Sequence, residues 1–165
     1  MKSSILPFIT LILFITGCSA LSSSTNNEEK AAQFEQTAAL IESGNYEYTI
    51  RSASPSGGRT IQITSSYTLE VEDGIYKAYL PYYGRAYNAS YGGNGGVEFE
   101  GEPDNLSVTK DDKKQTITVK FNIKNRDENY DCMLLVTSSG YGTLNVTSSK
   151  RQNISYYGTV AAKGE

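Results

Sequence analysis

The chain has 165 residues, with 15 basic and 18 acidic side chains and a net charge of −3. This weak negative charge gives nucleic acid and anionic lipid headgroups little reason to bind. Histidine is absent, which removes the usual general base near neutral pH, the commonest zinc ligand and every Ser-His or Cys-His dyad. We therefore expect a single domain that is not an enzyme and has no metal site and no cofactor.

The first eighteen residues resemble a bacterial lipoprotein signal peptide with its lipidation site. Lys2 supplies a positive charge, residues 5–15 form an apolar run, and small residues lead into Cys18. The run is too short for a membrane-spanning helix, which needs roughly 20 apolar residues. An ordinary secretory signal, cleaved a few residues later, is the other alternative. The resemblance implies that residues 1–17 are removed and that Cys18 carries acyl chains such as palmitate.

The residues after Cys18 indicate where the protein resides. Ser19 resembles the residue that permits sorting of lipoproteins to the outer membrane, and no acidic cluster resembling a surface-export signal follows it. We expect a lipid-anchored protein of the bacterial cell envelope, in the outer membrane and facing the periplasm. Residues 18–27 are small and polar, which predicts a lipidated cysteine with a flexible tether. Residues 28–165 are then left to form the folded domain.

A helix is expected over residues 28–43. Asn26 or Asn27 is its candidate N-cap, and two glutamates follow in the first turn. Its apolar stripe has members three or four residues apart: Ala31, Phe34, Ala38 and Ile41. This helix needs another surface to cover the stripe.

From residue 45 onward the apolar period is two, which predicts strands. Ten short strands are expected at 46–51, 61–64, 67–72, 75–80, 97–100, 105–110, 115–124, 130–137, 141–147 and 153–160. The short turns between them indicate antiparallel pairing. The predicted fold is mainly β, of the α+β class: an N-terminal helix packed against a curved antiparallel meander sheet or open barrel. A two-sheet sandwich is the alternative.

Residues 80–96 break the alternation, with Pro81 and a glycine cluster, and predict a long loop. Four tyrosines and an arginine in it are candidates for ligand binding: Tyr82, Tyr83, Arg85, Tyr87 and Tyr91. The aromatic rings suit stacking on a ligand ring such as a sugar, and the guanidinium suits a carboxylate. The alternative is that these tyrosines form a lid on the end of the sheet, with Arg85 over one of them.

Three runs of residues carry a resemblance to a known family. They are Leu80-Pro81-Tyr82-Tyr83-Gly84-Arg85-Ala86-Tyr87, Tyr91-Gly92-Gly93-Asn94-Gly95-Gly96-Val97-Glu98-Phe99 and Ser155-Tyr156-Tyr157-Gly158. They are similar to the Bacteroidetes lipoproteins classed as domain of unknown function 4251. The resemblance implies a lipid-anchored envelope domain with a helix followed by an antiparallel sheet. It implies no reaction, ligand or catalytic residue.

Glu98 and Glu100 are the one carboxylate pair worth weighing for catalysis. On a strand they share a face about 6.5–7 Å apart, which is within the range used by inverting glycosidases. Two solvated glutamates on the polar face of a strand are the ordinary interpretation. Cys132, in an alternating strand, is expected to be buried rather than reactive.

The function expected from these residues is that of a non-catalytic binding or scaffold module on the envelope. The lipid anchor provides the membrane as one partner, and a glycan, a small molecule or an envelope protein is the other. The oligomeric state is left open. Two competing functions are a lipocalin-like carrier of a small apolar ligand, with an internal cavity, and a glycan hydrolase that uses Glu98 and Glu100.

Overall fold

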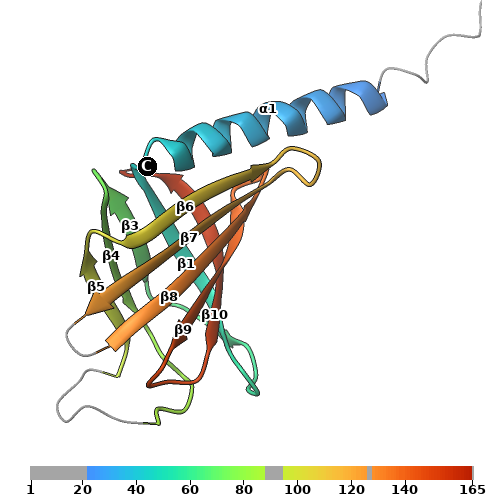
Figure 1. Ribbon diagram of the computed structural model, residues 1–165. Helices are drawn as coiled ribbons and strands as arrows, with labels where there is room; N and C mark the ends of the chain where they lie inside the picture. Colours follow the sequence, from blue (N-terminus) through green and yellow to red (C-terminus); the bar gives the residue numbers. More distant parts are fainter. Residues whose placement is uncertain (1–21, 88–94, 126–127, 165) are drawn as a thin grey trace, which may run out of the picture.

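The computed structural model describes residues 22–87, 95–125 and 128–164 (Figure 1). The helix and strands are α1 (Ser22–Glu42), β1 (Tyr46–Pro55), β2 (Ile61–Gln62), β3 (Thr68–Glu72), β4 (Ile75–Leu80), β5 (Val97–Gly101), β6 (Asp104–Asp111), β7 (Thr116–Asn125), β8 (Glu128–Thr137), β9 (Tyr141–Ser148) and β10 (Ile154–Ala162). All ten predicted strands are present. In the part of the chain that is described, no helix is long and apolar enough to cross a membrane.

The strands form one antiparallel sheet in the order β5-β4-β3-β1-β10-β9-β8-β7-β6, with β2 paired to β1. Neighbouring strands are mostly joined by tight turns. At Asp73 and Gly74, between β3 and β4, both φ angles are positive, as a two-residue hairpin of this kind requires. The sheet curls into a half-barrel, and the side-chain amide of Asn125 at the end of β7 donates to the Glu98 carbonyl of β5 at 2.6 Å. The predicted open barrel is therefore confirmed, and the sandwich is not observed.

The concave face of the sheet holds the core. Aromatic rings from opposite walls meet inside it: Tyr76 and Phe121 lie 4.6 Å apart by ring centroid, and Phe99 and Tyr130 lie 5.8 Å apart. A cavity for a ligand would leave its lining residues accessible to water. Every apolar residue of the core is at most 4% exposed. The inward-facing side chains fill the described interior, which argues against the ligand cavity that a lipocalin-like carrier needs.

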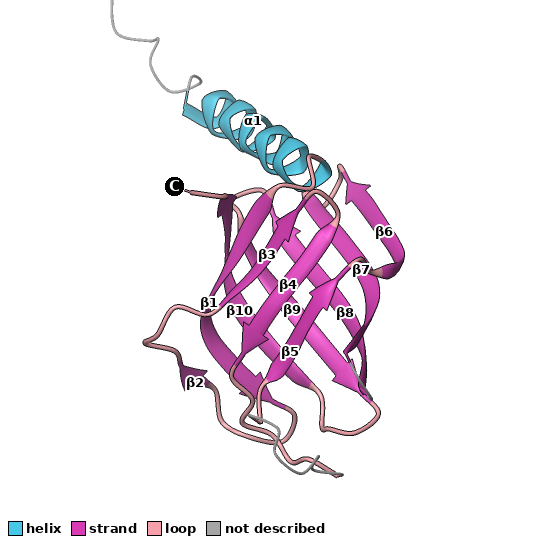
Figure 2. Ribbon diagram, turned by 90° about the vertical axis from the view of Figure 1, so that its left-hand side faces the viewer, coloured by secondary structure: helices cyan, strands magenta, loops and turns pink. Residues whose placement is uncertain are grey.

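Helix α1 lies across one end of the half-barrel (Figure 2). Phe34, Ala38 and Ile41 are buried there, as the stripe predicted, and the hydroxyl of Thr37 donates to the Ser138 carbonyl at 3.0 Å. Ala31 is exposed, because the first half of the helix extends beyond the barrel.

The helix begins at Ser22 rather than at residue 28, so most of the segment expected as a flexible tether is helical. A helix that is already nucleated extends at little cost per residue, which physically explains the longer element. The lipidation site Cys18 lies outside the described residues.

Three buried tyrosines, Tyr46, Tyr48 and Tyr156, differ in how their hydroxyls are satisfied. The Tyr48 hydroxyl lies 2.8 Å from the Gly142 carbonyl and 2.9 Å from the Tyr156 carbonyl, and the Tyr156 hydroxyl donates to Pro81 at 2.9 Å. The Tyr46 hydroxyl is buried without a hydrogen bond of normal geometry to any described residue. Burial, with the nearby Tyr76, raises the pKa of Tyr46 well above its usual value.

Replacing Tyr48 and Tyr46 by phenylalanine is expected to have different effects. Tyr48→Phe removes a satisfied buried hydroxyl and should lower the free energy of unfolding by about 1–3 kcal/mol. Tyr46→Phe removes an unsatisfied one and should leave stability unchanged or raise it by about 1 kcal/mol. Equilibrium urea unfolding measures both, and an equal loss in the two variants would contradict this account.

Candidate functional site

The candidate loop lies at the end of the half-barrel opposite α1, after β4 and before β5 (Figures 1 and 2). The structure describes its two flanks, residues 81–87 and 95–96. Tyr91 lies outside the described residues. Of the other candidates, Tyr82 packs inward. The remaining three are exposed: Tyr83, Arg85 and Tyr87.

Tyr82 is part of the fold rather than of an exposed binding surface. Its hydroxyl lies 2.9 Å from the Arg85 carbonyl and 2.8 Å from the Gln152 carbonyl. The Arg151 guanidinium lies over its ring, 5.3 Å from the centroid. Gly84 permits this packing, because a Cβ there would be 2.5 Å from the Tyr82 hydroxyl. The lid interpretation is correct for Tyr82, but the cation over the ring is Arg151 and not Arg85.

Residues 85–87 are held by backbone bonds to residues 150–152, which precede β10. The Gln152 amide donates to the Arg85 carbonyl at 2.9 Å, and the Tyr87 amide donates to the Lys150 carbonyl at 2.8 Å. This pairing fixes the backbone next to Tyr83 and Tyr87, the aromatic residues that are exposed in the described part of the loop.

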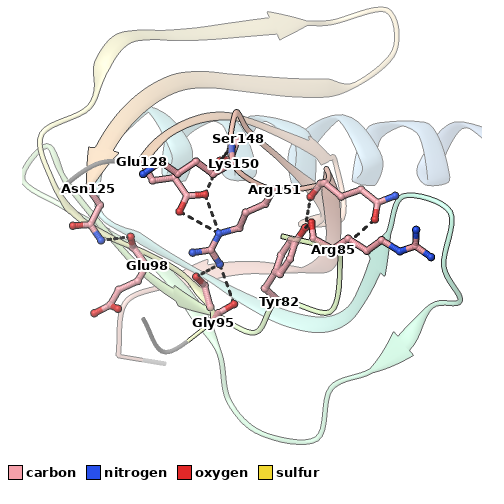
Figure 3. A network of polar contacts seen from close by, with 11 residues as sticks. Tyr82, Arg85, Gly95, Glu98, Asn125, Glu128, Ser148, Lys150 and Arg151 are labelled. Carbon is pink, nitrogen blue, oxygen red and sulfur yellow. Dashed lines mark hydrogen bonds and ion pairs between the residues drawn. The ribbon is translucent and has the colours of Figure 1, made fainter. Parts of the chain in front are cut away.

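Tyr83 and Tyr87 are 44% and 67% exposed, and Arg85 is exposed between them in the sequence. The Arg85 side chain points away from the buried polar network of this end (Figure 3). Among the described residues, no carboxylate lies within ion-pair distance of Arg85. These three side chains are therefore accessible to a ligand without breaking an observed contact.

The polar network at this end is centred on Glu128 and Arg151, which the sequence analysis did not identify (Figure 3). Arg151 Nε donates to the two carboxylate oxygens of Glu128 at 2.9 and 3.1 Å. Its Nη1 donates to the carbonyls of Gly95 and Gly96 at 2.9 and 2.6 Å. The arginine thus ties the last part of the candidate loop to the first residue of β8.

Burial alone would raise the pKa of Glu128. Hydrogen bonds from Ser148, Arg151 and Tyr130, together with the charge of Arg151, outweigh burial and hold the pKa below its ordinary value of 4.5. A carboxylate held ionised and fully hydrogen-bonded is suited to structure rather than to proton transfer. Neither residue carries a sequence signal, because Glu128 is a charged residue at the start of β8 and Arg151 stands in the polar connection before β10.

Glu98 and Glu100 lie on the outer, solvent-exposed face of β5, and Glu100 pairs with Lys77 at 3.5 Å. Glu100 lines a shallow hollow on this wall together with Lys77 and Lys163, and Glu98 is not part of its lining. The two carboxylates therefore do not share the cleft that the glycan hydrolase hypothesis requires. Cys132 is buried, and burial raises the pKa of its thiol, as expected for an inert cysteine. Within the described ranges, no group of three or more acidic or cysteine side chains is placed to hold a metal ion.

Arg151→Met is expected to lower the free energy of unfolding at pH 7 by about 2–4 kcal/mol, because it leaves the Glu128 carboxylate buried and unpaired. The loss should shrink as pH falls below about 4.5. In the parent protein the pKa of Glu128 is depressed, so its ionised carboxylate stabilises the fold above about pH 4.5, and this stabilisation is lost as the pH falls. In the variant, protonation at low pH removes the unpaired charge and with it the destabilisation. Urea unfolding at several pH values measures this.

Lys77→Met is the matched control, since it removes the cation of an exposed pair and should change stability by less than about 1 kcal/mol. An equal effect of the two substitutions, or a loss in Arg151→Met that does not depend on pH, would refute the structural role of the Glu128–Arg151 pair.

Comparisons with known proteins agree with this architecture. A search of curated proteins finds no match. A crystal structure of a DUF4251 family protein from Bacteroides eggerthii is similar, with a TM-score of 0.62 and 18% identity over 82% of this chain and 91% of that chain. At this identity the likeness shows the fold alone. The model of the family described as "Domain of unknown function (DUF4251)" matches residues 28–160, and the chain therefore belongs to the DUF4251 family.

Proposed function

We propose that the protein is a lipid-anchored, non-catalytic binding module of the bacterial envelope. Acylated Cys18 would hold it in the outer membrane, with the domain in the periplasm. The anchor side of the proposal comes from the sequence: a charged start, a short apolar run and small residues before Cys18. The binding side comes from the exposed group Tyr83, Arg85 and Tyr87.

The observation that carries the proposal is the placement of these two features. Helix α1, which follows Cys18 in the sequence, covers one end of the half-barrel, and the segment after β4, with residues 81–87, lies at the other end (Figures 1 and 2). That segment carries Tyr83, Arg85 and Tyr87. The first half of α1 stands beyond the barrel, and a helix rises 1.5 Å per residue, so residues 22–33 span about 18 Å. An anchor at the N-terminus would thus direct the exposed aromatic end away from the membrane.

The chemistry of this end favours a ring that bears a carboxylate, such as an acidic sugar. A guanidinium can bind a carboxylate through two parallel hydrogen bonds, and exposed tyrosine rings can stack on a ligand ring. The backbone bonds of residues 85–87 to residues 150–152 fix these groups before binding, which lowers the entropy that a ligand must overcome.

Cys18→Ala is expected to abolish incorporation of an alkyne analogue of palmitate and to move the protein out of the membrane fraction. Cys132→Ala is the matched control, because Cys132 is the other cysteine of the chain and is buried. It should label like the parent. Labelling of Cys18→Ala at the parental level would refute the anchor.

A photoreactive residue at position 83 is expected to capture a ligand or partner in cells, and Arg85→Ala should remove most of that product. Position 79 is the control, since Tyr79 is 49% exposed on the outer wall and Tyr83 is 44% exposed at the far end. Mass spectrometry identifies what is captured. The binding role of this end is rejected if position 83 yields nothing, or yields the same products as position 79.

A further inference from the structure

The outer face of β9 and β10 is chemically unlike the rest of the barrel wall. Neither strand contains a charged residue, whereas the flanking strands carry Glu47 and Arg51 in β1 and Asp131 in β8. Apart from Ala161 near the end of β10, the outward-facing side chains of the two strands carry hydroxyl or amide groups: Tyr141, Thr143, Asn145, Thr147, Ser155, Tyr157 and Thr159.

Two of these side chains form a pair of parallel aromatic rings. The ring planes of Tyr141 and Tyr157 are inclined by 11° and their centroids are 6.0 Å apart. Tyr141 is 49% exposed and Tyr157 is 47% exposed. Tyr67 and Tyr79, on another part of the wall, lie at a similar distance but are tilted by 37°. The Tyr141–Tyr157 pair thus offers apolar ring surface in a common orientation.

A hollow of about 550 Å³ lies further along the same two strands. The turn after β1 forms one wall, and Asn145, Asn153 and Ser155 supply polar groups on the other, with no charged side chain in the lining. The Ser155 hydroxyl donates to the Asn145 side-chain oxygen at 2.6 Å. The amide protons of Asn145 have no acceptor among the described residues and are available to a ligand.

We infer that the outer face of β9 and β10 binds a neutral polysaccharide chain. Sugar rings present apolar faces to aromatic rings, and their hydroxyls both donate and accept hydrogen bonds, as threonine, serine and asparagine do. The absence of charge from both strands matches a ligand without charge and gives an acidic glycan or an anionic lipid surface no cation to bind. The parallel rings and the hollow lie along one strand direction, which suits a chain of several sugars.

This surface is on the wall of the barrel and does not depend on the exposed group at the far end. Full-length protein in detergent is run in native gels that contain hydroxyethyl cellulose, β-glucan, galactomannan or dextran as neutral polymers, or polygalacturonate as a charged one. At least one neutral polymer should retard the protein, and polygalacturonate should not do so through these tyrosines. Tyr141→Ala and Tyr157→Ala should each weaken the retardation about tenfold.

Tyr157→Phe keeps the ring and should retain binding, and Tyr79→Ala, which removes an equally exposed tyrosine elsewhere, should have no effect. Tyr83→Ala should also leave it intact, which separates this site from the proposed far-end site. Retardation that persists in Tyr157→Ala, or no retardation by any neutral polymer, would overturn the inference. A dimer in light scattering that Tyr157→Ala dissociates would instead assign the face to a second copy of the chain.

Discussion

A single antiparallel sheet that curls around its own apolar face leaves two open ends and one open seam. The apolar core must be shielded from water at each of these places, and the other parts of this structure provide that shielding. Water could reach the core at either end, where the strands stop, and along the seam, where the ladder of hydrogen bonds is not closed. One end is covered by the apolar stripe of α1. The other is covered by Tyr82 and by the Glu128–Arg151 pair. The first cover is apolar, and the second combines an aromatic ring with an ion pair. The sequence indicated the apolar stripe and offered Tyr82 as a lid, but it did not indicate the ion pair.

The seam lies between β5 and β6, the two strands at the edges of the sheet. Strand β6 pairs on one side only, and Leu106 and Val108 on it are largely exposed. A register shift between Asp104 and Ser107, with a positive φ at Asn105, interrupts the edge. Such irregular edges resist pairing with another chain. Leu106 lies within this irregular part, whereas Val108 lies in the regular part of β6 from Ser107 to Asp111.

The strands were predictable because alternation is a local property: a residue pointing into the barrel is followed by one pointing out, whatever the strand pairs with. The same holds for Phe34, Ala38 and Ile41 of α1. The ion pair was not predictable, because Glu128 at the start of β8 and Arg151 before β10 are 23 residues apart and only the fold brings them together. For the same reason the sequence assigned the cation over a tyrosine to nearby Arg85, when distant Arg151 occupies that place.

Gln152 fixes the two candidate binding surfaces relative to each other. Its amide donates to Arg85, its carbonyl accepts from Tyr82, and its side-chain amide donates to the Ser56 carbonyl in the turn that walls the hollow beside β10. A displacement of the Tyr83, Arg85 and Tyr87 group would therefore strain the hollow as well. Such cross-linking favours a rigid platform, in which ligands meet preformed surfaces, over a barrel whose loop closes on its ligand.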